Sequence, residues 1–171
     1  MRETLRGQRV LLRPALPADL DPLAAILVTE PVARWWPNYD RERVEAEFLS
    51  AEPDERIYVV EVDGRPAGAI LATEEPEPEF RHASIDLFLD PALHGQGLGP
   101  DAIRTVAAEL IDVDGHHRLT IDPAADNAVA IRAYEKVGFR PVGRLRRYQR
   151  MADGTWADGL LMEMLADELV R

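Results

Sequence analysis

The sequence predicts a single mixed α/β domain, and three observations support this. Two apolar runs, 57–62 and 67–72, flank Asp63-Gly64, which is a strong signal for a hairpin of antiparallel strands. A third strand-like run, 81–89, leads through a glycine-rich loop into an amphipathic helix. Strand-like and helix-like segments then alternate to the end of the chain, which indicates one mixed sheet with helices on both faces.

Before the hairpin, the sequence predicts one strand and two helices. Residues 10–14 are typical of a strand. Asp19 stands where it would cap the first helix, and Pro22 fits the first turn of that helix. The apolar face of this helix consists of four leucines, Leu16, Leu20, Leu23 and Leu27. A second helix is expected over about 41–50.

The strand at 81–89 is expected to present two different faces. One face carries Ile85, Leu87 and Leu89, and the other carries Ser84, Asp86 and Phe88. Pro100 fits the first turn of the following helix. That helix repeats apolar residues at a spacing of three and four, which buries Ala102, Ile103, Val106, Ala107 and Leu110.

The remaining third of the chain is predicted to add one more helix and three strands. A strand at 119–121 precedes a helix that Asp126 caps and Gly138 ends. Asp153-Gly154 separates the two final strands, the last of which contains 160–162. The predicted order over residues 1–171 is β-α-α-β-β-β-α-β-α-β-β.

The glycine-rich loop after the third strand is the clearest functional signal. It reads His94-Gly95-Gln96-Gly97-Leu98-Gly99. Backbone N–H groups exposed at a helix N-terminus suit an anion such as a pyrophosphate. A P-loop is excluded because Pro100-Asp101 follows in place of Lys-Ser/Thr, and a Rossmann loop needs a different glycine spacing. Taken alone, the loop is equally compatible with a connection that binds nothing.

A second motif follows one helix and one strand later. Residues 122–127 read Asp-Pro-Ala-Ala-Asp-Asn, and the next helix leads into Tyr134-Glu135-Lys136-Val137-Gly138-Phe139. The two motifs together resemble the GNAT acetyltransferase superfamily, and the resemblance covers almost the whole chain. It implies acetyl-CoA as the cosubstrate. It also implies a mostly antiparallel sheet whose central strands, about 81–89 and 117–122, splay apart to admit the pantetheine arm.

Composition restricts the functions that the chain can have. A formal net charge of −11 makes nucleic-acid binding unlikely and would favour a cationic substrate, although solubility alone accounts for such a charge. The absence of cysteine excludes thiol catalysis and thiolate metal ligands, and His116-His117 lacks further ligands nearby. We therefore expect no metal. No apolar run approaches the length of a membrane span, so a cytoplasmic enzyme is expected, as a monomer or a homodimer.

The resemblance assigns roles in binding acetyl-CoA. The phosphate-binding loop is His94, Gly95, Gln96, Gly97, Leu98 and Gly99. Two departures stand out, because His94 replaces the usual Arg or Gln and Pro100 lacks an N–H. Backbone groups around Phe88 and Leu89 would pair with the pantetheine arm. Asn127 would bind that arm, or else serve only as a first-turn helix residue, and Tyr134 would protonate the thiolate unless it is a core residue.

Two aspartates are the candidates for the acceptor amine. Asp86 lies in the middle of a strand, where a carboxylate is disfavoured. It is expected to act as a base or as an ammonium anchor, with a solvated outward residue as the alternative. Asp122 ends the next strand, and it either binds a second ammonium or forms a turn before Pro123.

Within the superfamily, the chain is most similar to aminoglycoside 6′-N-acetyltransferases. The resemblance rests on Ile85-Asp86, on residues 121–139, and on residues 33–36, which include Trp35-Trp36. It implies transfer of acetyl to the 6′-amine of an aminoglycoside and hence antibiotic resistance. Trp35 and Trp36, with Tyr39 nearby, would line the drug site, although one of them is expected to be core packing.

Two other functions remain open at the level of sequence. One is acetylation of a ribosomal-protein N-terminus, which uses the same cofactor motifs, and the other is a non-catalytic acyl-CoA-binding module. The acidic segment from Glu74 to Glu79 is read as solvated or as attractive to a polycation. The arginines between Arg140 and Arg150 either offset the acidic surface or lie near a CoA phosphate.

Overall fold

The computed structural model describes residues 4–171, which form one mixed sheet flanked by helices. The strand order is β1-β2-β3-β4-β5-β6-β8-β7. The strands are β1 (Leu5–Arg6), β2 (Leu11–Pro14), β3 (Glu55–Val62), β4 (Arg65–Glu75), β5 (His82–Leu89), β6 (Arg118–Ile121), β7 (Arg140–Arg150) and β8 (Trp156–Leu165). The α-helices are α1 (Leu20–Leu27), α2 (Glu30–Ala33), α3 (Arg41–Phe48), α4 (Leu98–Asp112) and α5 (Ala128–Glu135). The predicted mixed, mostly antiparallel sheet is confirmed.

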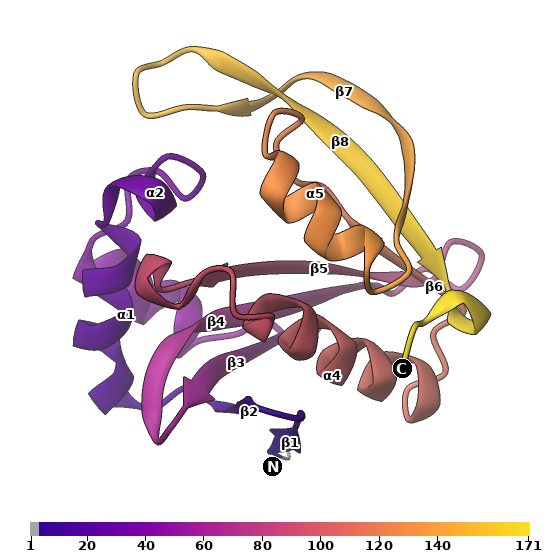
Figure 1. Cartoon of the computed structure of the whole chain (residues 1–171), viewed down its shortest axis with the longest axis horizontal. Coiled ribbons are helices and arrows are strands. Elements are labelled where there is room, and N and C mark those ends of the chain that lie inside the picture. The colour runs from indigo at the N-terminus through magenta and orange to yellow at the C-terminus, as the bar shows by residue number, and fades with distance from the viewer. Residues whose placement is uncertain (1–3) are drawn as a thin grey trace.

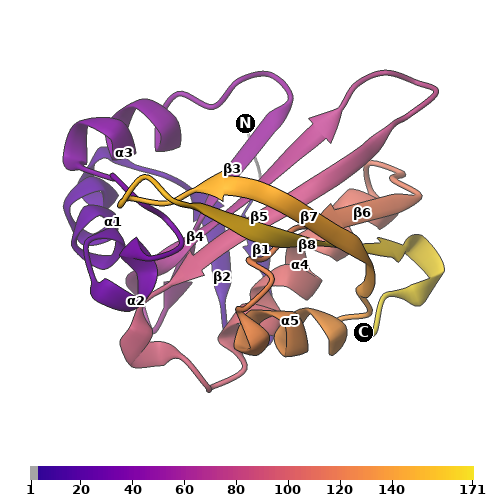
Figure 2. The same ribbon diagram turned by 90° about the horizontal axis from the view of Figure 1, so that it is seen from above.

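The helices cover both faces of the sheet, as the pattern predicted. In Figures 1 and 2, α1 to α3 lie together at one side of the molecule, and α4 and α5 lie apart from them. Along β3, Tyr58 and Val60 belong to the core beneath α4, whereas Ile57 and Val59 belong to the core beneath α1 to α3. This alternation follows from the two-residue period of a strand that is buried on both faces.

The hairpin of β3 and β4 forms at the predicted turn. Asp63 and Gly64 have φ of 50° and 75°, the left-handed pair that a tight two-residue hairpin turn needs. The helix after the glycine loop is also confirmed, and its five predicted core residues are all buried. The short elements β1 and α2 were not predicted, because two and four residues carry no periodic signal.

The capping predictions were partly wrong. Asn127, not Asp126, caps α5, and its side chain accepts a hydrogen bond from the Ala130 N–H at 3.3 Å. Asp126 instead forms an exposed ion pair with Arg34. Asp19 occupies the N-cap position of α1, but its carboxylate accepts two hydrogen bonds from Arg13 rather than capping the helix. In both cases a nearby arginine offers the carboxylate a charged partner.

The central strands separate, and this opens a wedge in the sheet. β5 and β6 pair in parallel only at Ala83 with Leu119 and at Ser84 with Thr120. β6 continues by pairing with β8, so β8 and β7 diverge from β5 (Figure 1). α5 lies in the wedge between them (Figure 1). The splay that the resemblance implied is therefore present.

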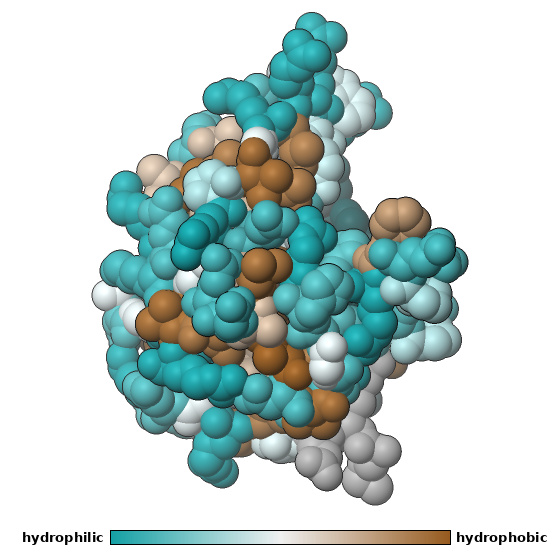
Figure 3. Space-filling view, turned by 90° about the vertical axis from the view of Figure 1, so that its right-hand side faces the viewer, coloured by the Kyte–Doolittle hydropathy of each residue, from teal (hydrophilic) through white to brown (hydrophobic). Residues whose placement is uncertain are grey.

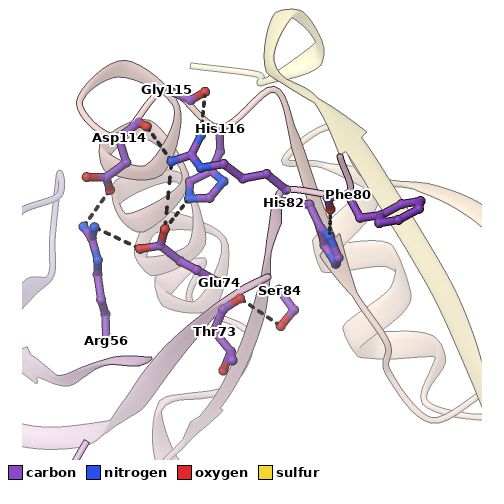
Figure 4. A network of polar contacts seen from close by, with 10 residues as sticks. Arg56, Thr73, Glu74, Phe80, His82, Ser84, Asp114, Gly115 and His116 are labelled. Carbon is purple, nitrogen blue, oxygen red and sulfur yellow. Dashed lines mark hydrogen bonds and ion pairs between the residues drawn. The ribbon is translucent and has the colours of Figure 1, made fainter. Parts of the chain in front are cut away.

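A polar network lies at the end of β5 and β6 where the two strands still pair (Figure 4). Arg56 forms ion pairs with Asp114 at 2.6 Å and with Glu74 at 3.1 Å. The buried ring of His116 contacts Glu74 at 2.9 Å, and Arg81 donates to the Asp114 and Gly115 carbonyl oxygens. Glu74 is thus a partner in this network, unlike the solvated charge that the sequence suggested.

The outer face at that end of the molecule is mostly hydrophilic, with hydrophobic residues in small separate patches (Figure 3). Among residues 4–171, no helix is both long enough and apolar enough to cross a membrane.

Candidate active site

A pocket of about 860 Å³ occupies the open end of the wedge between β5 and β6. Its walls come from the segment after α2, from β5, from the glycine loop, from α5 and from β7. Most of the predicted site residues line it, namely Trp35, Trp36, Asp86, Phe88, Leu89, His94, Gly95, Gly97, Leu98, Gly99, Asp122, Asn127 and Tyr134. Residues that are far apart in the sequence therefore converge on one cavity.

A second hollow of about 350 Å³ adjoins the first. Tyr39, which does not line the large pocket, lines this one. Five residues are shared by the two hollows, Trp35, Trp36, Asp86, Gln149 and Arg150. Because Asp86 belongs to both, a ligand in one hollow and a ligand in the other would meet at its carboxylate.

The glycine loop presents backbone donors at one end of the large pocket. Gly95 and Gly97 have φ of 76° and 77°, a conformation that favours glycine. Within residues 4–171, the N–H groups of positions 95–99 have no hydrogen-bond acceptor. The N-terminus of α4 thus offers unsatisfied donors together with its positive helix end, the physical requirements of an anion site.

His94 and Gln96 differ from the other loop residues. The His94 ring contacts the Leu89 carbonyl oxygen at 3.0 Å, so it ties the loop to the end of β5. Gln96 does not line the pocket, and its carbonyl oxygen accepts a hydrogen bond from Arg9 at 2.5 Å. The predicted role of Gln96 concerns its backbone N–H, and this role stays a prediction.

The backbone of β5 offers hydrogen-bonding groups to the gap at alternate residues. The Asp90 N–H donates to the Ala67 carbonyl oxygen on the β4 side, and a Cβ on Gly68 would collide with the Phe88 carbonyl oxygen. The main-chain groups of Phe88 therefore face β4, and those of Leu87 and Leu89 face the gap. Among the backbone groups around Phe88 and Leu89, those of Leu87 and Leu89 are therefore placed to pair with a pantetheine arm, and this pairing stays a prediction.

The Phe88 side chain belongs to an aromatic cluster instead. Its ring packs against Trp36 at 5.0 Å and against Phe48 at 5.9 Å between centroids. Tyr39 lies 5.9 Å from Trp36, and its hydroxyl donates to Glu47 at 2.6 Å. The wall beneath the smaller hollow is thus held in place by ring-to-ring contacts.

Asp86 is open to the pocket but lies deep among protein atoms. Its carboxylate accepts a hydrogen bond from the Leu87 N–H at 2.9 Å, and no basic side chain pairs with it within residues 4–171. Burial, together with the charge of Asp122, raises the pKa of Asp86 to about 7. A carboxylate with this pKa can both hold and release a proton near neutral pH.

Asp122 faces Asp86 across the splay. Burial raises the pKa of Asp122, while a hydrogen bond from the Tyr148 hydroxyl opposes that rise. Tyr148 comes from β7 and was not found by sequence reasoning, because nothing in the Arg-rich stretch around it predicts that its ring turns toward the pocket. The arrangement is a pair of carboxylates, of which Asp86 accepts from a main-chain N–H and Asp122 from a tyrosine hydroxyl.

Tyr134 stands beside both carboxylates. Its ring is only 7% exposed, and burial followed by the charges of Asp86 and Asp122 raises the pKa of its hydroxyl. Within residues 4–171 this hydroxyl has no hydrogen-bond partner, although it lines the pocket. Tyr134 is therefore a protonated donor that is available to a ligand.

Arg132 and Lys136 are pocket residues that sequence reasoning also missed. They lie one turn apart on α5, and both line the large pocket, as does the loop at the start of α4. Their i, i+4 spacing inside the second motif was the available signal. Of the arginines in β7, only Arg150 lines the pocket. No group of three metal-ligating side chains is present in residues 4–171.

Comparison with known proteins decides the family. A model of the acetyltransferase (GNAT) family matches residues 21–139, well over half of the chain. The chain belongs to the GNAT acetyltransferase family. It is also 33% identical over 75 residues to the N-alpha-acetyltransferase RimI of Mycobacterium tuberculosis. The matched stretches span only 22% and 45% of the lengths of the curated relatives that the chain matches.

Solved GNAT structures share the whole fold. Mycobacterium smegmatis RimJ in complex with CoA-disulfide has a TM-score of 0.82 at 23% identity, covering 99% of this chain and 90% of that one. Spermidine N-acetyltransferase from Vibrio cholerae, in complex with CoA and spermine, has a TM-score of 0.80 at 20% identity, covering 95% and 98%. At these identities the likeness establishes the fold alone.

Proposed function

We propose that this GNAT protein transfers the acetyl group of acetyl-CoA directly to a primary amine of a cationic small molecule, with the 6′-amine of an aminoglycoside as the first candidate. This proposal rests on one observation: Asp122 and Tyr134 line the large pocket beside Asp86, whose carboxylate lies where the two hollows meet. The donor would enter from the glycine loop, and the acceptor would enter through the smaller hollow.

The larger pocket suits acetyl-CoA along its whole length. The free N–H groups of positions 95–99 receive the pyrophosphate, and Arg132 and Lys136 supply positive charge that a chain of net charge −11 otherwise lacks. The Leu87 carbonyl oxygen and the Leu89 N–H pair with the pantetheine arm in the gap, because the Leu87 N–H already donates to Asp86 and the Leu89 carbonyl oxygen contacts His94. Asn127 lies on the opposite wall, where its amide group is directed by the cap of α5.

The transfer needs one base and one acid. The two carboxylates hold the acceptor ammonium, and Asp86 takes one proton from it, which frees the lone pair that attacks the thioester carbonyl. As the C–N bond forms and the C–S bond breaks, the nitrogen loses its second proton. That proton reaches the departing thiolate by way of the Tyr134 hydroxyl, so CoA leaves as the thiol and Tyr134 stays protonated.

The acceptor site supports a polyamine with a ring that can lie on aromatic walls. Asp86 and Asp122 have no basic partner within the described residues, so a dication would neutralise both. Trp35, Trp36 and Tyr39 provide the flat walls. Such chemistry fits an aminoglycoside.

A protein N-terminal α-amine is the second candidate. Arg150 lines both hollows, and its positive charge disfavours a polycation while it suits the carbonyl groups of a peptide. The sequence likeness to RimI points in the same direction.

The test is thiol release from acetyl-CoA by the purified protein with a matched set of acceptors. The set contains kanamycin, tobramycin, an aminoglycoside with a 6′-hydroxyl, spermidine, and peptides that begin with Ala or Ser. Turnover confined to drugs with a 6′-amine supports the first candidate function. Turnover with peptides alone supports the second candidate function, acetylation of a protein N-terminus. Thiol release with none of these amines contradicts the proposed function.

A further inference from the structure

The strand β7 contains an irregular segment where it passes the pocket. Its pairing with β8 is interrupted between Leu145 and Gln149, and Arg147 in the interruption has φ of 48°. A non-glycine residue in this left-handed region is uncommon and needs support from its surroundings. The interruption is a bulge that redirects the residues after it.

One aspartate of the neighbouring strand holds this bulge. Asp158 accepts a hydrogen bond from the Arg147 N–H at 2.7 Å and another from the Arg144 side chain at 2.7 Å. On the far side of the bulge, the Gln149 side chain donates to the Trp35 carbonyl oxygen at 2.8 Å. The segment 147–149 is therefore fixed at both ends. Arg147 is bonded to β8, and Gln149 is bonded to Trp35 in the wall of the smaller hollow.

The residue that the bulge presents is Tyr148. Its ring lies against Gly159 of β8, where an added Cβ would stand 2.8 Å from the tyrosine Cδ1 atom. Gly159 thus leaves the space that the ring occupies. From that position the Tyr148 hydroxyl donates to the Asp122 carboxylate, and Tyr148 itself lines the large pocket.

We infer that Tyr148 is a positioning residue of the acceptor site. Its hydroxyl holds the Asp122 carboxylate ionised and directed toward the same acceptor amine that Asp86 binds. This inference rests on the proposed acetyl transfer to an amine. Without a donor, a half-buried carboxylate facing a second carboxylate would take up a proton or turn away. The bulge, Asp158 and Gly159 together form the support that prevents this.

The charged and titratable groups around Asp122 agree with the role. Asp86 from β5 and Tyr134 from α5 share its cavity. The same cavity is also lined by Arg150 of β7, by His94 of the glycine loop, and by Arg132 and Lys136 at the end of α5. The hydrogen bond to Asp122 raises the pKa of Tyr148 to about 12, so Tyr148 remains a donor throughout the neutral range. The same hydrogen bond lowers the pKa of Asp122, because a donor stabilises the ionised form of a carboxyl group.

The experiment compares Tyr148→Phe, Gly159→Ala and the double variant with wild type. Tyr148→Phe removes only the hydroxyl, whereas Gly159→Ala keeps the hydroxyl but displaces the ring. The carboxyl carbons of Asp122 and Asp86 are titrated by NMR in the protein without substrate. The Asp122 midpoint should rise by about half to one pH unit in each single variant, and the double variant should add little.

Kinetics at pH 8, with the best amine acceptor found, supply the second readout. We expect the KM for the amine to rise about 3- to 10-fold in each single variant, while kcat changes less than about twofold. Trp156→Phe is the matched control, because Trp156 is exposed on β8 and does not line either hollow. It should leave both the titration and KM unchanged.

The two ways of failing are distinguishable. An unchanged Asp122 midpoint and an unchanged KM in an active Tyr148→Phe enzyme overturn the role of Tyr148 and leave the acetyltransferase intact. A raised midpoint in a protein whose wild type acetylates no amine overturns the proposed function instead, and with it the role of Tyr148 in acceptor binding.

Discussion

The two ends of the β5–β6 pair use carboxylates in opposite ways. At the paired end, Glu74 and Asp114 both form ion pairs with Arg56 (Figure 4). At the splayed end, Asp86 and Asp122 face each other with no basic partner in residues 4–171. Paired charges stabilise the fold, whereas unpaired ones cost free energy that a cationic ligand can recover. The difference separates an end whose charges are paired within the fold from the end at which we propose that ligands bind.

The largest effect is expected from Asp86. Asp86→Asn keeps the size of the side chain but removes its charge and its basicity, so kcat/KM should fall about 10²-fold or more. The thermal stability should stay the same or rise, because the variant removes one of two mutually repelling carboxylates. Steady-state kinetics with the best amine acceptor checks the first result, and a thermal melt checks the second. Near-wild-type turnover would exclude Asp86 as the base.

The next effect concerns the paired end. Arg56→Met removes the guanidinium that joins Glu74 to Asp114, so the free energy of unfolding should fall by about 1–3 kcal/mol. Because the network is remote from the pocket lining, kcat/KM measured well below the melting temperature should change little. Urea denaturation measures the loss of stability.

Arg41→Met is the matched control for Arg56. Arg41 pairs with Asp21 and Glu45 on the exposed surface, where an ion pair contributes little. An equal loss of stability in both variants would contradict a special role for the network.

The pH dependence of catalysis reports directly on the splayed end. Asp86 has its pKa raised to about 7, so it is a competent base only above that pH. We expect kcat/KM to fall about tenfold for each pH unit below about 7. Asp122→Asn removes the charge that raises the pKa of Asp86, so the acid limb should move to lower pH. A limb that stays in place in this variant would show that the two carboxylates are not coupled.

The smallest effect is expected at Arg132 and Lys136, where we propose that the phosphates of acetyl-CoA bind. Neutralising Arg132 and Lys136 with glutamine should raise the KM for acetyl-CoA about 3- to 10-fold and leave kcat nearly unchanged. The increase should shrink at high salt, since exposed charges are screened. Arg146→Gln is the control, because Arg146 is exposed on β7 and does not line the pocket. An equal change in KM in this control would point to net charge rather than to a local site.

The splay and the bulge could not have been read from local residue patterns. The separation of β5 from β6 depends on β8 pairing with β6 about 40 residues later in the chain, and the resemblance to a family supplied it in advance. The bulge at Arg147 is held by Asp158 of the next strand, and no local pattern in β7 indicates this contact. Tyr148 and the Arg56 network were missed for the same reason, because their partners are brought together only by the fold.

The sequence by itself determined the features whose causes are local. Asp63-Gly64 specified the hairpin turn, the glycines specified the loop at the start of α4, and the spacing of apolar residues specified the face of α4. Those features depend on backbone conformation and on periods of two and 3.6 residues. Only the tertiary structure decided which main-chain groups of β5 face the gap, which aspartates meet, and which tyrosine holds one of them, because each of these depends on contacts between distant segments.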